Sequence, residues 1–291
     1  MVSINTNPGA LIALQNLTQI NSDLEQTQRR VSTGLEVSSA ADNPAIFALA
    51  QRQRAELGSI ESVQQGLRIG SSAVDVALAA GESISDILVE MRAIASQASD
   101  PSISAGELQV LEEQFVSQRQ QIERLVDSAE IGGRNLLEAG ATDLTVVANT
   151  DGSDTITVQA QDLSTSGGIL TFSFADNPFV AIPDDPATVG VDESQAAAST
   201  PATEIAAIEQ SIDNLSLSLA RLGAGSQALT LQGDLLTKIS DTLEVSIGNL
   251  VDADLARESS RLQALQVQQQ LSIQTLSIAN AAPNAILALF A

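Results

Sequence analysis

The chain has 291 residues, a formal net charge of −23 at pH 7, and a hydrophobic content of 44% with only 2% aromatic residues. Apolar content carried by aliphatic side chains favours long helix–helix seams over a compact globule. Because histidine and cysteine are absent, the chain lacks the usual general base, the thiolate nucleophile and most zinc ligands. We therefore expect a protein that is not an enzyme and that holds neither a metal nor a cofactor.

The same composition argues against two classes of partner. Nucleic acids and anionic membranes bind basic surfaces, whereas this chain has 36 acidic and 13 basic residues. No apolar run reaches the roughly 20 residues of a membrane span, and residues 1–7 lack the basic start of a secretory signal. We expect neither nucleic-acid binding nor membrane insertion, and any export must depend on a different signal.

The first helix is predicted to begin at Asn7-Pro8, because Asn is a good N-cap and Pro suits the first helical position. Ser32-Thr33-Gly34 predicts its end. Between these points a coiled-coil seam recurs at alternating spacings of four and three residues. Ile12 and Ile20 lie off this seam, so the helix should contact more than one neighbour. The seam positions are Ala10, Leu14, Leu17, Asn21, Leu24, Gln28, Val31 and Leu35.

A second, longer helix is predicted between Asp42-Asn43-Pro44 and Asp100-Pro101. A shorter third helix should follow and stop at Gly132-Gly133. The seam of the second helix is Ile46, Leu49, Ile60, Val63, Leu67, Val74, Ala77, Ile84, Leu88, Met91 and Ala95, and the third carries Leu108, Leu111, Phe115, Ile122 and Leu125.

In the middle of the chain, the helical spacing of apolar residues gives way to strand-like alternation. Residues 144–148 and 155–159 alternate in the manner of strands around an Asp-Gly turn, which predicts a β-hairpin. Residues 169–174 form a third candidate strand, and the proline-containing stretch after them reads as an irregular excursion. Between residues 135 and 220 there are thirteen acidic residues and no basic one. A solvated acidic surface is favoured over a calcium site, because the spacing of a calcium loop is missing.

The longest helix is predicted to start at Thr200-Pro201. Its seam recurs every seven residues, which is typical of a multi-helix rod. We therefore predict a mainly α fold, a long antiparallel helical-bundle or coiled-coil rod, with a small β-hairpin region at the distal tip and both termini at the opposite end. The seam residues are Ile208, Leu215, Leu222, Leu229, Leu236, Leu243 and Leu250.

The last helix and the first share an unusual lack of charge. Residues 262–291 contain no charged side chain, and residues 1–22 contain none either. Helices that expose this much apolar surface owe their stability to packing against other helices. We expect these ends to be disordered in a monomer and ordered in a self-assembled structure.

The ends also resemble a known family, the bacterial flagellins, in the short form found in alphaproteobacteria. The resemblance covers about the first 140 and the last 90 residues. It is carried by SINTN at 3–7, RRVSTGLEVSSAADNPA at 29–45, IGGRNLL at 131–137, VDADLARESSRLQALQVQQQL at 251–271 and LSIANAAPNAILALF at 276–290.

This resemblance implies a structural subunit that polymerises with itself into the extracellular flagellar filament, a passive helical propeller for swimming motility. It also implies type III export, an escort chaperone that binds the C-terminal helix, a filament cap and hook–filament junction proteins as partners. The implied domains are a D0 helix and connector at 1–40, D1 helices at 41–141, a β-hairpin and short variable excursion at 142–200, a D1 helix at 201–248 and a D0 helix at 249–291.

Residue-level expectations follow from the same resemblance. Glu90 and Gln114 stand where many flagellins have an arginine and a glutamate used by the host innate receptor, so we expect weak activation of that receptor. The candidates for inner-tube contacts are Leu14, Leu17, Leu24, Leu262, Leu265, Leu271 and Leu276. The candidates for O-glycosylation are Ser164, Thr165, Ser166, Ser199 and Thr200.

Two alternatives remain at this stage. A hook–filament junction protein would share the end architecture, although the tail at 276–290 looks like that of a flagellin. A cytoplasmic coiled-coil adaptor would explain the heptads, but soluble coiled coils normally flank the seam with charged residues, which the ends of this chain lack.

Overall fold

The computed structural model describes residues 7–165, 167–173, 179 and 200–287, with side chains described as far as residue 281. These residues are mainly helical and form only small antiparallel strand pairs, which confirms the predicted fold class. The helices are α1 (Pro8–Thr33), α2 (Pro44–Ala98), α3 (Ala105–Ser128), α4 (Pro201–Val251) and α5 (Leu255–Leu287), and the strands are β1 (Glu130–Ile131), β2 (Arg134–Asn135), β3 (Leu144–Val147) and β4 (Thr155–Val158).

The chain divides into two compact units. Met1–Gly58 and Ser240–Ala291 form the first, which we call the terminal unit, and Ser59–Ile239 forms the second, which we call the central unit. Helices α2 and α4 each contribute a segment to both units, whereas α1 and α5 belong to the terminal unit alone.

Local capping explains where the helices begin and end. The side chain of Asn7 accepts a backbone N–H of the first turn of α1 at 3.2 Å. Gly34 ends that helix with a left-handed φ of 73°, and its N–H donates to the carbonyl of Arg30. Ser104 and Glu107 form a reciprocal capping box at the start of α3. Caps of this kind satisfy backbone groups that the helix itself leaves unpaired, so sequence predicts them well.

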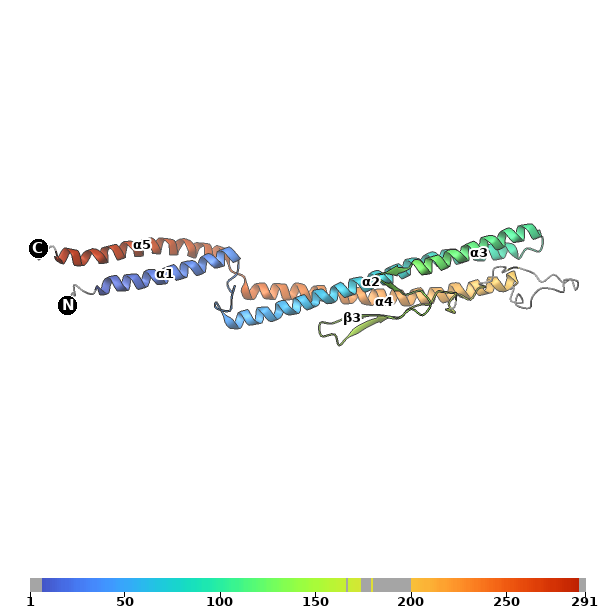
Figure 1. Ribbon diagram of the computed structural model, residues 1–291, viewed down its shortest axis with the longest axis horizontal. Coiled ribbons are helices and arrows are strands. Elements are labelled where there is room, and N and C mark those ends of the chain that lie inside the picture. Colours follow the sequence, from blue (N-terminus) through green and yellow to red (C-terminus); the bar gives the residue numbers. More distant parts are fainter. Residues whose placement is uncertain (1–6, 166, 174–178, 180–199, 288–291) are drawn as a thin grey trace. The chain divides into compact units, whose positions relative to one another are not determined.

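In the terminal unit, α1 and α5 lie side by side and antiparallel (Figure 1). The connector after α1 meets the junction between α4 and α5: Leu35 and Asp252 form an isolated antiparallel bridge, and Ala253 donates its N–H to the carbonyl of Gly34 at 2.9 Å. A small hydrophobic core lies next to this bridge, and Leu35 packs against it. Its buried members are Val37, Ala50, Ile247 and Val251.

In the central unit, α2 and α4 run antiparallel along a shared seam. Arg92 pairs with Glu209 at 2.6 Å, and the hydroxyl of Ser226 lies 3.3 Å from the carboxylate of Asp75. Residue numbers therefore increase along α2 in the direction in which they decrease along α4. The predicted heptad positions are buried along this seam, which confirms the periodicity. They include Ile60, Leu67, Val74, Ala77, Ile84, Leu88, Met91 and Ala95 on α2 and Ile208, Leu215, Leu222, Leu229 and Leu236 on α4.

An aromatic cluster packs around Phe115 of α3 in the central unit. Phe115 of α3 is 1% exposed and meets Phe172 edge-to-face, with ring centroids 6.2 Å apart. It meets Phe179 in the same manner at 5.1 Å. Phe172 and Phe179 therefore pack against α3 as part of the core. The sequence had predicted a strand around Phe172 and an irregular excursion after it.

The β3–β4 hairpin forms as predicted but occupies a different place. Leu144 pairs with Val158, and Val146 pairs with Ile156. The inward side chains of β3 and β4 lie against α2 and α4, where Gly70 and Gly225 leave room for valine methyl groups. The hairpin thus packs beside the two helices and not beyond their ends, which corrects the expected position at the distal tip. Small residues on the helices allow this close approach.

The third candidate strand is not a strand in its described part. The N–H of Thr171 donates to the hydroxyl of Ser211 at 2.8 Å, and the side chain of Asn214 donates to the carbonyl of Ile169 at 3.1 Å. Backbone groups at 169–173 are therefore paired with side chains of α4, and no strand pairs with them among the described residues. Conversely, the β1–β2 pair around Gly132-Gly133 was not predicted, because only a helix stop was inferred there.

Candidate assembly surface on α1 and α5

Polar contacts join α1 and α5 at three levels. Arg30 Nη1 lies 3.2 Å from Glu258 Oε1. Further along, Gln269 Nε2 donates to Asn21 Oδ1 at 2.7 Å. Near the other end, the side chain of Asn7 donates to the backbone carbonyl of residue 279 at 2.7 Å. The two helices are therefore held in one antiparallel alignment.

The apolar contacts between α1 and α5 differ from the predicted seam on α1. Ala13 and Thr27 are buried, whereas Leu14 and Gln28 face outward. Leu17, Leu24, Leu262 and Leu276 are half-buried and Leu265 is buried, so these five inner-tube candidates contribute to packing within the chain. Small side chains at two inward positions of α1 permit the helices to approach closely.

The outward face of the pair is rich in large apolar side chains. We call seven of these residues, each at least half exposed, the outward rows, because contiguous exposed apolar surface usually marks an interaction site. Only Leu14 and Leu271 among them were predicted as assembly contacts. The signal for the others was the missing charge of both ends, which leaves the helices without a charged face. The rows consist of Leu11, Ile12 and Leu14 on α1 and Val267, Leu271, Ile273 and Ile278 on α5.

The connector between α1 and α2 is organised by one carboxylate. Asp42 Oδ2 accepts hydrogen bonds from the backbone N–H and the hydroxyl of both Ser38 and Ser39, at 3.0 to 3.1 Å. The hydrogen bond from the Ser38 side chain, with the bonds from Ser39, lowers the pKa of Asp42. Next to it, Asn43 Oδ1 accepts two N–H groups at the start of α2. The negative charge therefore stabilises the turn that leads into α2.

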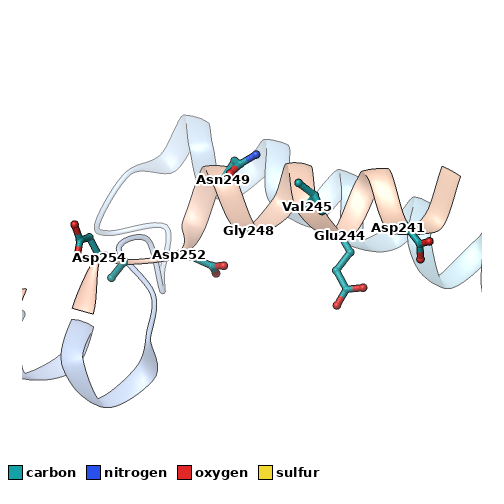
Figure 2. Close-up of a pocket in the computed structure, with 8 residues that line it drawn as sticks. Asp241, Glu244, Val245, Gly248, Asn249, Asp252 and Asp254 are labelled. Atoms are coloured by element: carbon teal, nitrogen blue, oxygen red, sulfur yellow. The ribbon is translucent and has the colours of Figure 1, made fainter. Parts of the chain in front are cut away.

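An open hollow of about 680 Å³ lies where α4 ends and α5 begins (Figure 2). Its lining includes the carboxylates of Asp241, Glu244, Asp252 and Asp254. Asp254 Oδ1 accepts the N–H groups of residues 256 and 257, and so caps α5. Among the residues that the structure describes, no group of three or more His, Cys, Asp or Glu side chains could hold a metal ion.

The remaining predicted residues lie in the central unit. Glu90 on α2 is exposed and accepts a hydrogen bond from Gln118 of α3 at 2.7 Å, and Gln114 is exposed on α3. Of the glycosylation candidates, Thr165 and Thr200 are exposed, and Ser164 donates its hydroxyl to Asp162 at 2.5 Å. Ser166 and Ser199 lie outside the described residues. No helix in the described ranges is long and apolar enough to cross a membrane.

Comparison with known proteins gives a consistent picture. Sequence profiles of the bacterial flagellin N-terminal and C-terminal helical regions match residues 4–142 and 205–290. The chain is 41% identical over 288 residues to flagellin FljK of Caulobacter vibrioides, covering 99% of this chain and 98% of that protein. It is 35% identical over 300 residues to a flagellin of Brucella melitensis, covering 100% and 99% of the two chains.

Among solved structures, a flagellar hook-associated protein of Vibrio parahaemolyticus aligns with a TM-score of 0.56 and 15% identity. The alignment covers 72% of this chain and 100% of that chain. This likeness concerns the fold alone.

Proposed function

Because this chain belongs to the bacterial flagellin family, we propose that its subunits assemble through the outward rows of α1 and α5. The chain is a structural subunit of the extracellular flagellar filament and polymerises with itself for swimming motility. Its identity to flagellins extends over nearly the full length, which favours the filament subunit over a junction protein or a coiled-coil adaptor. A catalytic role has no part in this proposal.

The observation that carries the proposal is the exposure of the outward rows in a single chain. Ile278 is 72% exposed and Ile12 is 59% exposed. Burying one such side chain in an interface contributes roughly 1.5 to 3 kcal/mol. A row of seven can therefore offset the ordering of two helices when neighbouring copies cover it. Hydrogen exchange of monomer and filament would test whether α1 and α5 become ordered only on assembly.

The roles of the seven predicted leucines divide accordingly. Leu14 and Leu271 are assigned to contacts between subunits, since both are exposed in the chain. The other five, Leu17, Leu24, Leu262, Leu265 and Leu276, are assigned to the α1–α5 interface, where they hold the pair together so that the outward rows form one surface. Within this proposal, residues 1–40 and 249–291 make the inner D0 layer, residues 41–141 and 201–248 make D1, and residues 142–200 contribute the β-hairpin and the variable excursion.

Truncation tests this proposal. Removing residues 267–291 deletes the four outward-row members of α5 and leaves the described central unit intact. We expect a soluble, helical protein that forms no filaments, because half of the apolar assembly surface is gone. Removal of an internal surface segment, such as the tip of the β3–β4 turn at residues 150–153, serves as the control and should leave assembly intact. Filaments formed by the truncated chain would refute the proposal.

Further partners belong to the same proposal. The uncharged C-terminal helix would bind an export chaperone in the cytoplasm, the chain would leave through the type III apparatus, and the cap and the hook–filament junction proteins would contact it at the ends of the filament. The apolar outward row of α5 supports the first of these, because such a surface needs cover before assembly. Loss of chaperone binding on truncation of residues 267–291, measured with the purified chaperone, is the expected result.

The surface hydroxyls of the middle region are proposed O-glycan acceptors. Thr165 and Thr200 are accessible, while the hydroxyl of Ser164 is engaged by Asp162 and is the weaker acceptor of the three. The intact mass of the subunit from sheared filaments decides the matter. A mass equal to that of the bare chain would contradict glycosylation at these residues and at Ser166 and Ser199.

A further inference from the structure

The break between α4 and α5 lies in a segment that lacks the residues which usually end a helix. Only residues 252–254 separate the last residue of α4, Val251, from the first residue of α5, Leu255 (Figure 2). From residue 249 to residue 282 there is no glycine and no proline, and no residue at the break or beside it has a left-handed φ. A helix that has formed extends without a further cost of nucleation. The end of α4 therefore needs a cause outside this segment.

Backbone groups of the connector between α1 and α2 take the place of helical hydrogen bonds at the break. In a continuous helix, the N–H of Ala253 and the carbonyl of Val251 would each pair with a residue four positions away. Ala253 instead donates its N–H to the carbonyl of Gly34 at 2.9 Å. The carbonyl of Val251 accepts the N–H groups of Glu36 and Val37 at 2.7 and 3.3 Å. Two backbone groups that a continuous helix would use are therefore paired with the connector.

Side-chain contacts on both sides of the break hold the connector in this position. On the α4 side, Val37 is 6% exposed and packs with Ile247 and Val251 in the small hydrophobic core of the terminal unit. On the α5 side, Arg30 lies 3.2 Å from Glu258, in the first turn of that helix. These contacts form only when the end of α1 and the connector lie against both helices. They therefore stabilise the broken arrangement over a continuous helix.

The residues that follow the break can support either arrangement. Residues 255–271 are mostly Ala, Leu, Arg, Glu and Gln, which favour a helix whether it starts at Leu255 or continues from α4. Asp254 caps α5 in the broken arrangement, where its carboxylate accepts the N–H groups of residues 256 and 257. An aspartate is also tolerated inside a helix. The local sequence thus permits a start of α5 at this point but does not require an end of α4.

From these contacts we infer that residues 34–37 of the connector end α4, and that α4 continues through residues 252–254 when the connector is not docked. The consequence for assembly rests on the proposed function. Docking of the connector brings α5 against α1, so the outward rows of the two helices come together only in a chain whose connector is docked. The junction is therefore a conformational control on self-association, because an undocked chain does not present both rows as one surface.

Nuclear magnetic resonance of the full, unassembled chain tests the cause of the break. Val37→Asp places a charge in the apolar core and should release the connector. Ala40→Asp adds the same charge at an exposed position of the connector and is the matched control. Amide exchange at residues 36 and 37 reports whether the connector is docked, and carbon-13 chemical shifts of residues 252–254 report whether they are helical. Filaments of the natural chain supply the docked reference.

We expect non-helical shifts at residues 252–254 in filaments of the natural chain and of Ala40→Asp. In unassembled Val37→Asp, amide exchange at residues 36 and 37 should be fast and the shifts at 252–254 should be helical. Non-helical shifts in a chain whose connector is free would overturn the inference, because the break would then be encoded locally. Helical shifts in a chain whose connector is protected from exchange would overturn it as well.

A second measurement uses assembly and does not depend on the folding of Val37→Asp. Val37→Ala should loosen the connector and raise the critical concentration for polymerisation at least about fivefold. Leu255→Pro changes a half-exposed side chain; proline suits the first position of α5 but blocks a helix that continues from α4. Alone it should assemble like the natural chain, and combined with Val37→Ala it should recover most of the loss.

The combined variant separates the inference from the proposed function. If Leu255→Pro does not recover the assembly of Val37→Ala, no continuous helix competes with the broken arrangement and the inference is wrong. Failure of the assembly proposal itself would appear differently, as filaments formed by the chain that lacks residues 267–291.

Discussion

Gly225 of α4 provides the space that the side chain of Val158 of β4 occupies. A Cβ atom added at Gly225 would lie 2.7 Å from each γ-methyl group of Val158 and 3.3 Å from its Cβ. Val158 is 3% exposed, and its branched side chain cannot turn away because both methyl groups are in contact. The β3–β4 hairpin can therefore pack closely against α4 because Gly225 has no side chain.

Gly225→Ala should destabilise the protein by about 1 to 3 kcal/mol, because the added methyl overpacks the hairpin interface. Gly223→Ala is the matched control two residues earlier on the same helix, where nothing lies within 4 Å of an added Cβ. That change should stabilise the helix by about 0.5 to 1 kcal/mol. Thermal unfolding followed by circular dichroism measures both, and equal shifts of the two variants in one direction would contradict the packing described here.

Leu271→Ala should weaken assembly without altering the helical content of the monomer, because the side chain is 55% exposed in the single chain. Because about half of the side chain is left to bury in an interface, the loss is about 0.8 to 1.6 kcal/mol per subunit contact, which raises the critical concentration for polymerisation roughly 4- to 15-fold. Gln270→Ala, at the neighbouring exposed position, is the control and should leave the critical concentration nearly unchanged. Sedimentation of filaments at a series of protein concentrations gives the critical concentrations. Identical critical concentrations for the two variants would argue against the outward rows as contacts between subunits.

The connector should lose protection in acid because of Asp42. Its pKa is lowered by hydrogen bonds from Ser38 and Ser39, so its contribution to stability is fully present above the pKa of the unfolded chain and is lost as pH falls through the lower folded value. Amide hydrogen exchange in residues 36–43, corrected for intrinsic rates, should be constant near neutral pH and increase below about pH 4.

The variant Asp42→Asn removes the negative charge to which Ser38 and Ser39 donate their hydrogen bonds. We expect faster exchange of the connector at neutral pH, by a factor of about 5 to 10 from the loss of charge-assisted hydrogen bonds, and little further change in acid. Glu36→Gln, an exposed substitution in the same segment, should keep the natural pH profile. A pH profile of Asp42→Asn that matches the unaltered chain would show that this carboxylate does not organise the connector.

The host innate receptor for flagellin should respond weakly to the monomer. Glu90 is exposed on α2 and Gln114 on α3. The resemblance to flagellins implies that they stand where many members of the family have an arginine and a glutamate used by the receptor. Glu90→Arg combined with Gln114→Glu should increase activation of a receptor reporter line at least about tenfold through regained charge pairing. Glu82→Arg, exposed on the same helix, controls for charge alone, and strong activation by the unaltered monomer would refute the expectation.

Helix ends could be predicted from the sequence where local chemistry decides them: the start of α1 at Asn7-Pro8 and its end at Gly34 depend on bonds within a few residues. Most of the predicted heptad positions of α2 and α4 are buried, although Leu49 of α2 is 46% exposed. The predicted strand at 169–174 is absent from its described part, because an alternating stretch pairs with a strand only if one is adjacent. Here Ser211 and Asn214 of α4 supply the hydrogen-bond partners instead.

The assembly surface was only partly predictable for a related reason. Heptad spacing places Leu14 in the seam, but Ala13 is the buried residue and Leu14 faces outward. Large apolar side chains lie on more than one face of α1, so the spacing leaves its seam undefined and the contacts with α5 decide which face is inward. The Arg30–Glu258 pair, one of the contacts that join α1 to α5, links residues 228 positions apart and has no local signature.

Electron cryo-microscopy of filaments sheared from cells tests the central claim most directly. Helical reconstruction should show α1 and α5 ordered in the filament, with Leu11, Leu14, Leu271 and Ile278 within about 4.5 Å of apolar side chains of neighbouring copies. Leu265 should remain between the two helices of its own chain. A filament in which the outward rows contact only solvent, or in which α1 and α5 are absent from the lattice, would contradict the account.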